Sequence, residues 1–265
     1  NSDKYVGKSH NKFYGLHASV YNCKLSRSRL IREKVTANYG KVCDVSVNMG
    51  WTAGIKKWGQ LAESAIDKEC LQFVEYTVFH PTRDSPTDYC RSHPLIDQKA
   101  DGTIKARLVC GKTVHGSEID YNVPLYSPVI DSKLIYMMLS LCLKHENNFG
   151  VLDVKGAFFK AMMDANEEVY VHLEPKIATR MVKLKPDWSK FLRKDKSMMV
   201  ISDKAWYGTA VASALWNKEI TATLTKICGY QQHSMCKCLF YKHVNGHLCF
   251  ILLHVDDLGI SIYAT

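Results

Sequence analysis

Leu252-Leu253-His254-Val255-Asp256-Asp257-Leu258 ends an unbroken apolar run with two adjacent carboxylates. Residues 248–253 predict a buried strand, and the alternation over residues 258–262 predicts a second strand. The two aspartates then lie at the tip of a hairpin. Two ionised carboxylates beside an apolar sheet are costly unless a cation or solvent relieves their repulsion. A metal site and a solvated Asp-Asp turn are the competing interpretations.

The composition is that of a globular domain with an uneven charge. The chain has 265 residues, of which 46% are hydrophobic, enough for a sizeable core. Its net charge of +9 is concentrated in residues 1–41, where nine lysines and arginines face two acids. We expect residues 1–50 to form a basic, weakly ordered segment. Such a segment suits contact with phosphate and is equally typical of a solvated tail.

The chain lacks the sequence signals of membrane insertion and of a disulfide framework. No apolar run reaches about 18 residues and no leader has an apolar core, so we expect an intracellular protein with no membrane partner. The ten cysteines are scattered and are expected to be free thiols. Because the chain begins at Asn1 rather than Met and ends soon after Asp257, we expect it to be a segment of a longer protein.

One group of histidines and cysteines invites a zinc hypothesis. It consists of His233, Cys236, Cys238, His243 and His247. Zinc sites usually separate a Cys pair from a His pair by a loop of about a dozen residues. Here the Cys pair runs directly into an apolar strand, so a zinc-binding structural protein is only a third interpretation.

Hydrophobic periodicity predicts the elements before the hairpin. Residues 55–73 predict one amphipathic helix, residues 80–100, with three prolines, predict a loop, and residues 104–109 predict a strand with a basic face. Asp131 is expected to cap a helix over residues 134–143, which is apolar on nearly all sides and should be buried.

Later segments alternate between strands and helices. Residues 149–154 predict a strand ending near Asp153, and residues 169–173 predict another. Residues 175–197 are expected to be a basic insertion, and residues 212–227 predict a helix that stops at Gly229.

Asp153 and the hairpin aspartates match the needs of two-metal phosphoryl transfer. Two Mg²⁺ ions about 3.5–4 Å apart need carboxylates from separate strands, because one strand cannot wrap both ions. One ion lowers the pKa of an attacking hydroxyl, and the other neutralises a leaving pyrophosphate. Asp153, Asp256 and Asp257 are therefore candidate metal ligands.

Several motifs, in order along the chain, carry a family resemblance. They are Lys105-Ala106-Arg107-Leu108-Val109, Asp120-Tyr121 with Ser127-Pro128-Val129, Leu152-Asp153-Val154-Lys155-Gly156-Ala157-Phe158, Glu168-Val169-Tyr170-Val171, Lys204-Ala205-Trp206-Tyr207-Gly208, Leu215-Trp216, Gly229-Tyr230 and His254-Val255-Asp256-Asp257. Together they resemble the reverse transcriptase of copia-type LTR retrotransposons (Pseudoviridae) over about residues 50–263.

The resemblance implies an α+β fold, the fingers and palm of a right-hand polymerase, with helices packed on an antiparallel palm sheet. The palm is expected at about residues 149–165 and 203–265, and the fingers at about residues 51–148 and 166–202. The thumb is expected to be absent. With the RNase H and integrase segments, it would belong to the remainder of the pol polyprotein.

The resemblance also implies the metal site. Asp153 and Asp256 would be ligands of two Mg²⁺ ions, with Mn²⁺ as a possible substitute, and Asp257 would be a supporting carboxylate. The backbone carbonyl of Val154 would complete the shell. His254, which stands where the family usually has Tyr, and Val255 would be the first two residues of the polymerase motif that ends with Asp256 and Asp257. Both would lie beside the primer end.

The nucleotide site is implied in the same way. Lys105 and Arg107 would meet the triphosphate of a dNTP, where an Arg fork suits phosphate geometry. Phe158 would be an aromatic gate against a 2′-hydroxyl. Val211 replaces a polar residue, commonly Gln, and cannot donate a hydrogen bond. A solvated strand face for the two cations and a core position for Phe158 are the alternatives.

The implied function is that of an RNA-directed DNA polymerase, which transfers a nucleotide to a primer 3′-hydroxyl on an RNA or DNA template. Its expected location is the cytoplasm, in a virus-like particle, or the nucleus. The alternative is a truncated, inactive relic that retains nucleic-acid or partner binding. Val211 and the missing thumb favour the relic, whereas the three intact aspartates favour an enzyme.

Overall fold

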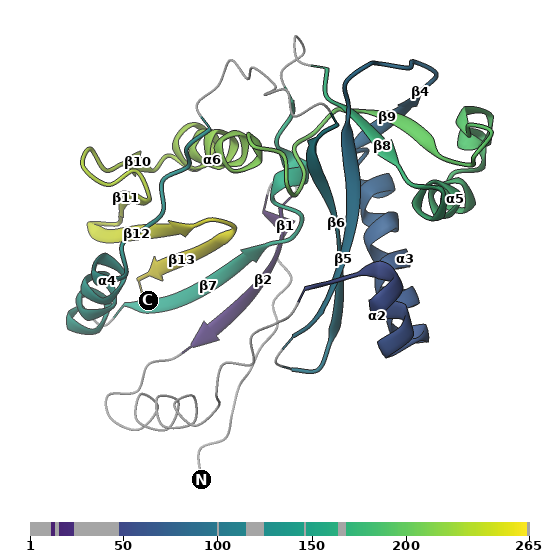
Figure 1. The fold of residues 1–265 in the computed structure, drawn as a ribbon. Helices are drawn as coiled ribbons and strands as arrows, with labels where there is room; N and C mark the ends of the chain where they lie inside the picture. Colours follow the sequence, from purple (N-terminus) through teal and green to yellow (C-terminus); the bar gives the residue numbers. More distant parts are fainter. Residues whose placement is uncertain are drawn as a thin grey trace. The chain divides into compact units, whose positions relative to one another are not determined.

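A computed structural model describes residues 48–99, 101–114, 125–145, 147–163 and 168–263, together with the backbone of residues 12–13 and 16–23. The chain divides into two compact units (Figure 1). Unit 1 comprises Asn1–Val42, Ser127–Ala157 and Asn217–Thr265, and unit 2 comprises Cys43–Tyr126 and Phe158–Trp216. The expected mixed α+β class is confirmed.

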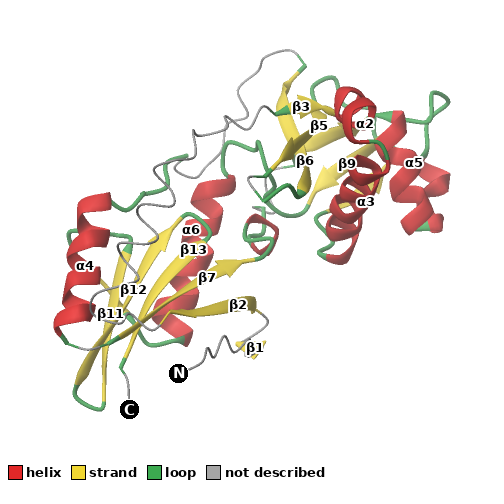
Figure 2. Cartoon of the chain, turned by 90° about the horizontal axis from the view of Figure 1, so that it is seen from below, coloured by secondary structure: helices red, strands yellow, loops and turns green. Residues whose placement is uncertain are grey.

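Unit 1 is built on a seven-stranded antiparallel sheet, with helices alongside its strands (Figure 2). In spatial order the strands are β1 (Lys12–Phe13), β2 (Leu16–Cys23), β7 (Asn148–Val154), β13 (Asp257–Ile262), β12 (His247–His254), β11 (Leu239–Val244) and β10 (Gln231–Gln232). The helical elements are α4 (Ser132–Lys144), the end of α6 (Ala212–Ala222) and the π-helical segment η3 (Thr223–Ile227). The predicted hairpin is therefore β12 and β13, and the predicted strand ending near Asp153 is β7.

Helix α4 begins as predicted but is not buried as predicted. Asp131 is its N-cap, and its side chain accepts a hydrogen bond from the backbone N–H of Lys133. Met138 and Cys142 are buried, but the side chain of Tyr136 is 71% exposed. The expectation of burial on most sides is wrong, because within the described residues only one side of this apolar helix is well covered.

Unit 2 contains a six-stranded sheet in which β5 is central. The strands are β3 (Met49–Gly50), β5 (Cys90–Gln98), β8 (Tyr170–Leu173), β9 (Met198–Ser202) and β4 (Phe79–Thr82) in spatial order, with β6 (Ile104–Thr113) also paired to β5. The helical elements are α2 (Trp51–Trp58), α3 (Gln60–Glu75), η1 (Phe158–Lys160), α5 (Pro175–Leu184) and η2 (Pro186–Phe191). Aromatic rings occupy the core, where Phe73 packs edge-on against Phe159 and Trp206.

Three predictions for unit 2 need correction. The single helix expected over residues 55–73 is two helices, because Gly59 takes a positive φ of 50° and ends α2. The insertion expected over residues 175–197 contains α5, which starts with Pro175 in its first turn. The loop expected over residues 80–100 contains most of β4 and all of β5.

Strand β5 tolerates Pro94 because of its register. On one side β5 pairs with β6 along its length, and on the other side β3 pairs with Leu95 and Ile96 while β8 pairs with Cys90 and Arg91. Pro94 lies outside both of the latter ladders, so its missing N–H removes no hydrogen bond from them. None of the helices in the described residues is long and apolar enough to cross a membrane.

Candidate active site

The three candidate aspartates meet at one end of the sheet of unit 1. Asp257 on β13 pairs directly with Asp153 on β7. Residues directly opposite each other in antiparallel strands have Cα atoms about 4.5–5.5 Å apart. The backbone N–H of Val154 donates to the carbonyl oxygen of Asp256 at 3.1 Å. Two hydrogen-bonded elements thus bring together acids that are about a hundred residues apart in sequence.

The tip of the hairpin is a tight turn with an unusual backbone. His254 pairs with Asp257, so Val255 and Asp256 form a two-residue connection. Val255 has a φ of 57°, a conformation that favours glycine and is strained for a β-branched residue. Two-residue hairpin turns require positive φ at their first position, which explains why Val255 adopts it. The strained residue immediately precedes Asp256.

The electrostatics of Asp257 reflect its neighbours. Desolvation raises the pKa of this carboxyl, and the negative charges of Asp256 and Asp153 raise it further, while His254 opposes the shift. The acids therefore repel one another at a partly desolvated site. A divalent cation would relieve that repulsion, and carboxylate oxygens are the donors that Mg²⁺ prefers.

The donor chemistry fits a metal ion, but the side chains are not already gathered around one. No group of three or more His, Cys, Asp or Glu side chains in the described residues is arranged to hold a metal. A bound ion would have to draw the carboxylates together from the adjacent backbones. The zinc hypothesis gains no support either, since His233 Nδ1 accepts hydrogen bonds from the backbone N–H groups of Met235 and Cys236.

Lys105 and Arg107 lie on β6 in unit 2, where both are partly buried. Nη1 of Arg107 lies 3.0 Å from Oδ2 of Asp97, whose residue is only 8% exposed, and Lys105 is opposite Asp97 in the strand register. Arg107 is thus engaged by a carboxylate of β5. A phosphate that binds Arg107 has to compete with that carboxylate.

Glu69 is a buried acid that the sequence analysis missed. Oε1 of Glu69, on α3, accepts a hydrogen bond from the backbone N–H of Leu108 at 3.1 Å. Burial raises the pKa of Glu69 to about 7, although Lys105 and Arg107 lower it. Its position three residues after Ile66, on the apolar side of the helix, was the available signal.

The aromatic and apolar candidates occupy separate surroundings in unit 2. Phe158 is partly buried, and its ring meets the ring of Tyr207 edge-on with centroids 5.3 Å apart. Phe159 is fully packed in the core. Val211 is completely buried within the same hydrophobic cluster, so its side chain offers a potential ligand no polar group.

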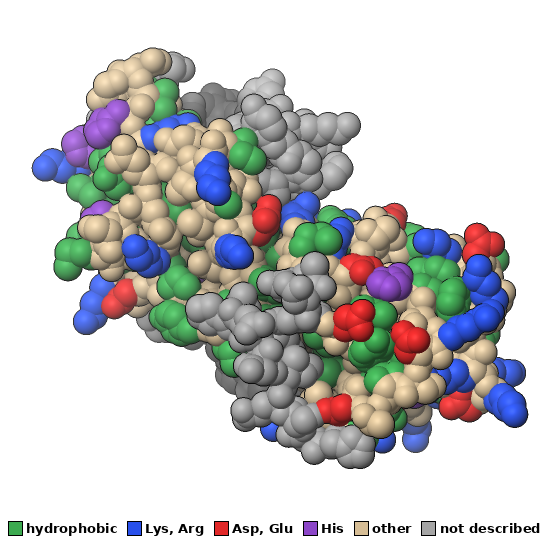
Figure 3. All heavy atoms as spheres, turned by 90° about the horizontal axis from the view of Figure 1, so that it is seen from above, with side chains coloured by type: hydrophobic (Ala, Val, Ile, Leu, Met, Phe, Trp, Pro, Cys, Tyr) green, Lys and Arg blue, Asp and Glu red, His purple; other side chains and the backbone are tan. Residues whose placement is uncertain are grey.

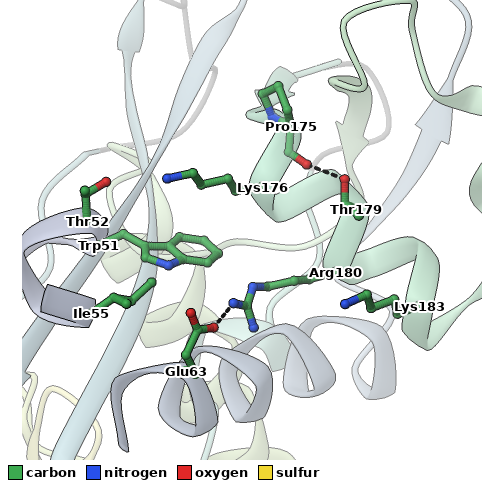
Figure 4. A pocket seen from close by; sticks show the side chains of 9 residues that line it. All are labelled: Trp51, Thr52, Ile55, Glu63, Pro175, Lys176, Thr179, Arg180 and Lys183. Carbon is green, nitrogen blue, oxygen red and sulfur yellow. Dashed lines mark hydrogen bonds and ion pairs between the residues drawn. The ribbon is translucent and has the colours of Figure 1, made fainter. Parts of the chain in front are cut away.

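A hollow of about 480 Å³ lies between α2, α3 and α5 of unit 2 (Figure 4). Arg180 crosses it, forms ion pairs with Glu63 and Asp67, and places its guanidinium 5.0 Å from the ring centroid of Trp51. Figure 4 shows Arg180 reaching from α5 toward the indole and Glu63. This arginine therefore joins the helices of unit 2.

Figure 3 shows the charged side chains of the described residues on one face. There, lysines and arginines are interspersed with acidic and apolar side chains.

The sequence matches the family model described as "Reverse transcriptase (RNA-dependent DNA polymerase)" over residues 81–263, more than half of the chain. The chain therefore belongs to this family of retrotransposon reverse transcriptases, and the resemblance is confirmed. Membership implies a nucleic-acid template, and polymerases of the family generally use a divalent metal. No curated protein matches the chain.

Proposed function

We propose that the chain provides the palm and fingers of a copia-type RNA-directed DNA polymerase, with unit 1 as the palm and unit 2 as the fingers. The antiparallel sheet that holds the aspartates supports the palm assignment. Since α4 groups with that sheet, the proposed palm begins near Ser127 rather than near residue 149. Residues 158–216 then belong to the fingers.

The observation that carries this proposal is the pairing of Asp257 with Asp153 beside the Val154–Asp256 hydrogen bond. Asp153 and Asp256 hold the metal ions, Asp257 supports them, and the carbonyl of Val154 contributes a further oxygen. When bound, two Mg²⁺ ions, or Mn²⁺ in their place, lower the pKa of the primer 3′-hydroxyl and neutralise the pyrophosphate. His254 and Val255 lie beside the primer end.

The fingers supply the nucleotide contacts in this proposal. Arg107 exchanges Asp97 for oxygens of the dNTP triphosphate, and Lys105 adds a second cation. Phe158, supported by the ring of Tyr207, blocks a 2′-hydroxyl. Val211 contributes shape only, because it has no hydrogen-bonding group.

The second candidate function is an inactive relic that still binds nucleic acid or a protein partner. Two observations favour it. Val211 is buried where the family commonly has a polar residue, and Arg107 is already engaged by Asp97. Neither observation affects the aspartates, so metal binding and catalysis have to be measured separately.

The test uses the whole 265-residue chain with the variants Asp153→Asn and Asp256→Asn. Mn²⁺ binding is measured by electron paramagnetic resonance, and primer extension is measured on an RNA template with dNTPs. Both variants should lose Mn²⁺ binding and extension, whereas Asp187→Asn, an exposed carboxylate of η2, should retain both. Unchanged Mn²⁺ binding in both site variants would exclude the metal site. If the unaltered chain binds Mn²⁺ but does not extend a primer, the result would support the inactive relic as the function.

A further inference from the structure

A single segment of unit 2, residues 175–197, concentrates positive charge. It contains α5, η2 and the turn before β9, and it has eight lysines and arginines against two aspartates. Outside this segment and residues 1–41, the chain has 18 lysines and arginines against 22 acids. The positive charge of unit 2 is therefore local, and the aspartate site of unit 1 does not account for it.

Six exposed lysines of this segment, called the lysine surface below, have no acidic partner among the described residues. The two arginines, in contrast, are engaged. Arg180 forms ion pairs with Glu63 and Asp67. Nη2 of Arg193 donates to the carbonyl oxygen of Asp84 at 2.9 Å. An anion that approaches this segment therefore meets lysines rather than arginines. The lysine surface consists of Lys176, Lys183, Lys185, Lys190, Lys194 and Lys196.

The lysine surface borders the hollow between α2, α3 and α5. Lys176 and Lys183 line this hollow and lie two turns apart on α5, which corresponds to about 10 Å along the helix axis. Figure 4 shows their side chains on either side of the contact between Arg180 and Trp51. Trp51 also lines the hollow, and its buried indole N–H has no hydrogen-bond partner among the described residues. The hollow thus offers a ligand two separated cations and an unused donor.

Charge rather than apolar area distinguishes this surface. Leu184 is 39% exposed, and no other large apolar side chain of residues 175–197 is as exposed. Protein partners generally need apolar or aromatic anchors at the centre of an interface. Phosphates need only positive charge and hydrogen-bond donors, and lysine binds them as a point charge. Cations spread along α5 and η2 suit the repeated phosphates of a nucleic-acid strand better than they suit one isolated phosphate.

We propose that the lysine surface binds the backbone phosphates of a nucleic-acid strand. The contact has no base specificity, because lysines that meet phosphates read no base edges. It goes beyond the proposed function, since it needs neither a metal ion nor a dNTP and would persist in an inactive relic. Membership in a family that uses a nucleic-acid template agrees with this class of partner, but it assigns no contact to these lysines.

The first measurement is the affinity of the 265-residue chain for a fluorescent single-stranded RNA, followed by anisotropy at several salt concentrations in buffer without divalent metal. For a single strand, each phosphate contact contributes about 0.7 to the slope of log affinity against log salt. The double variant Lys176→Gln/Lys183→Gln should therefore lower the magnitude of the slope by about 1.4 and weaken binding at low salt. Lys194→Gln/Lys196→Gln should have the same effect.

Lys133→Gln/Lys144→Gln is the matched control, because it removes two exposed lysines from α4 of unit 1. Its affinity and its slope should equal those of the original chain. Equal losses in all three double variants would indicate a general effect of net charge and would overturn the proposal. Polyglutamate serves as the competing anion. If it binds as tightly as RNA and loses affinity in the same variants, the surface is a site for acidic proteins and the proposal is wrong.

The second measurement locates the contact through the indole N–H NMR signal of Trp51, identified by its loss in Trp51→Phe. Saturating RNA should shift this signal in the original chain, and an unchanged signal would refute a contact at the hollow. Asp153→Asn should bind RNA normally in metal-free buffer. RNA binding without primer extension would therefore defeat the proposed function alone. Primer extension together with normal RNA binding by the lysine variants would defeat the lysine surface alone.

Discussion

Replacement of Glu69 by glutamine should remove a large part of the pH dependence of folding. Glu69 is 9% exposed, and its carboxyl accepts a hydrogen bond from the backbone N–H of Leu108. Glutamine retains an oxygen that can accept the same bond, but it cannot ionise. The variant therefore separates the charge of Glu69 from its hydrogen bond.

The magnitude follows from the pKa of Glu69, which burial raises from 4.5 to about 7. At a pH below 4.5 the group is protonated in both the folded and the unfolded chain. Between 4.5 and about 7 it ionises only in the unfolded chain, so stability falls as the pH rises and then levels off. A pKa difference of this size corresponds to about 3 kcal/mol, since a change of one in pKa is worth about 1.4 kcal/mol.

The assay is urea unfolding of the original chain and Glu69→Gln from about pH 4 to about pH 8. Relative to the original chain, the variant should gain up to about 3 kcal/mol of unfolding free energy across this range. Glu75→Gln, at the exposed end of the same helix, controls for loss of any carboxylate from α3. Parallel pH curves for the original chain and Glu69→Gln would refute the reasoning.

Three further changes test the hairpin, the aspartates and the helices of unit 2. Val255→Gly should raise the free energy of unfolding by about 1 kcal/mol, because it removes strain at a positive φ, and chemical denaturation measures this. Asp153→Asn should move the pKa of Asp257 down toward its ordinary value, because one repelling charge is lost, and ¹³C NMR of the carboxyl groups measures this. Arg180→Ala should lower the free energy of unfolding by about 2 kcal/mol, because it breaks two ion pairs and the contact with an indole ring.

Each of these changes has a matched control. Val244→Gly, at a β11 position without positive φ, should lower the free energy of unfolding by about 0.5–1 kcal/mol. If Val255→Gly also lowers the free energy of unfolding, the strain argument is contradicted. Glu219→Gln removes an acid that does not contribute to the shifted pKa of Asp257, so an equal effect would discredit the charge argument. Lys176→Ala, in the same hollow as Arg180, should change stability by less than about 0.5 kcal/mol.

Local sequence patterns predicted the parts of the fold that depend on local chemistry. The apolar run before His254 and the alternation after Asp257 predicted β12 and β13, and Asp131 predicted the start of α4. The pairing of Asp257 with Asp153 followed from the same reasoning, because aspartates at the ends of paired strands lie opposite each other. The break at Gly59 was missed because the apolar period continues across it.

Features that depend on partners distant in sequence escaped prediction. Pro94 and its polar neighbours predicted a loop, yet pairing with β6 makes this segment a strand. The burial of α4 was overestimated because an apolar sequence does not reveal how many neighbours a helix has.

The basic strand β6 shows why two competing interpretations of a charge can both be incomplete. Lys105 and Arg107 were expected either to meet phosphate or to face solvent. In the structure both are partly buried, and cations in that position need compensating charge. Asp97 supplies it from β5, and Glu69 supplies it from α3 when ionised. The cations are therefore part of the internal charge balance of unit 2 before any ligand arrives. If Arg107 binds a triphosphate as proposed, the triphosphate would gain only the difference between its own attraction and that of Asp97, and the acids beside the strand would then affect nucleotide affinity as much as the cations.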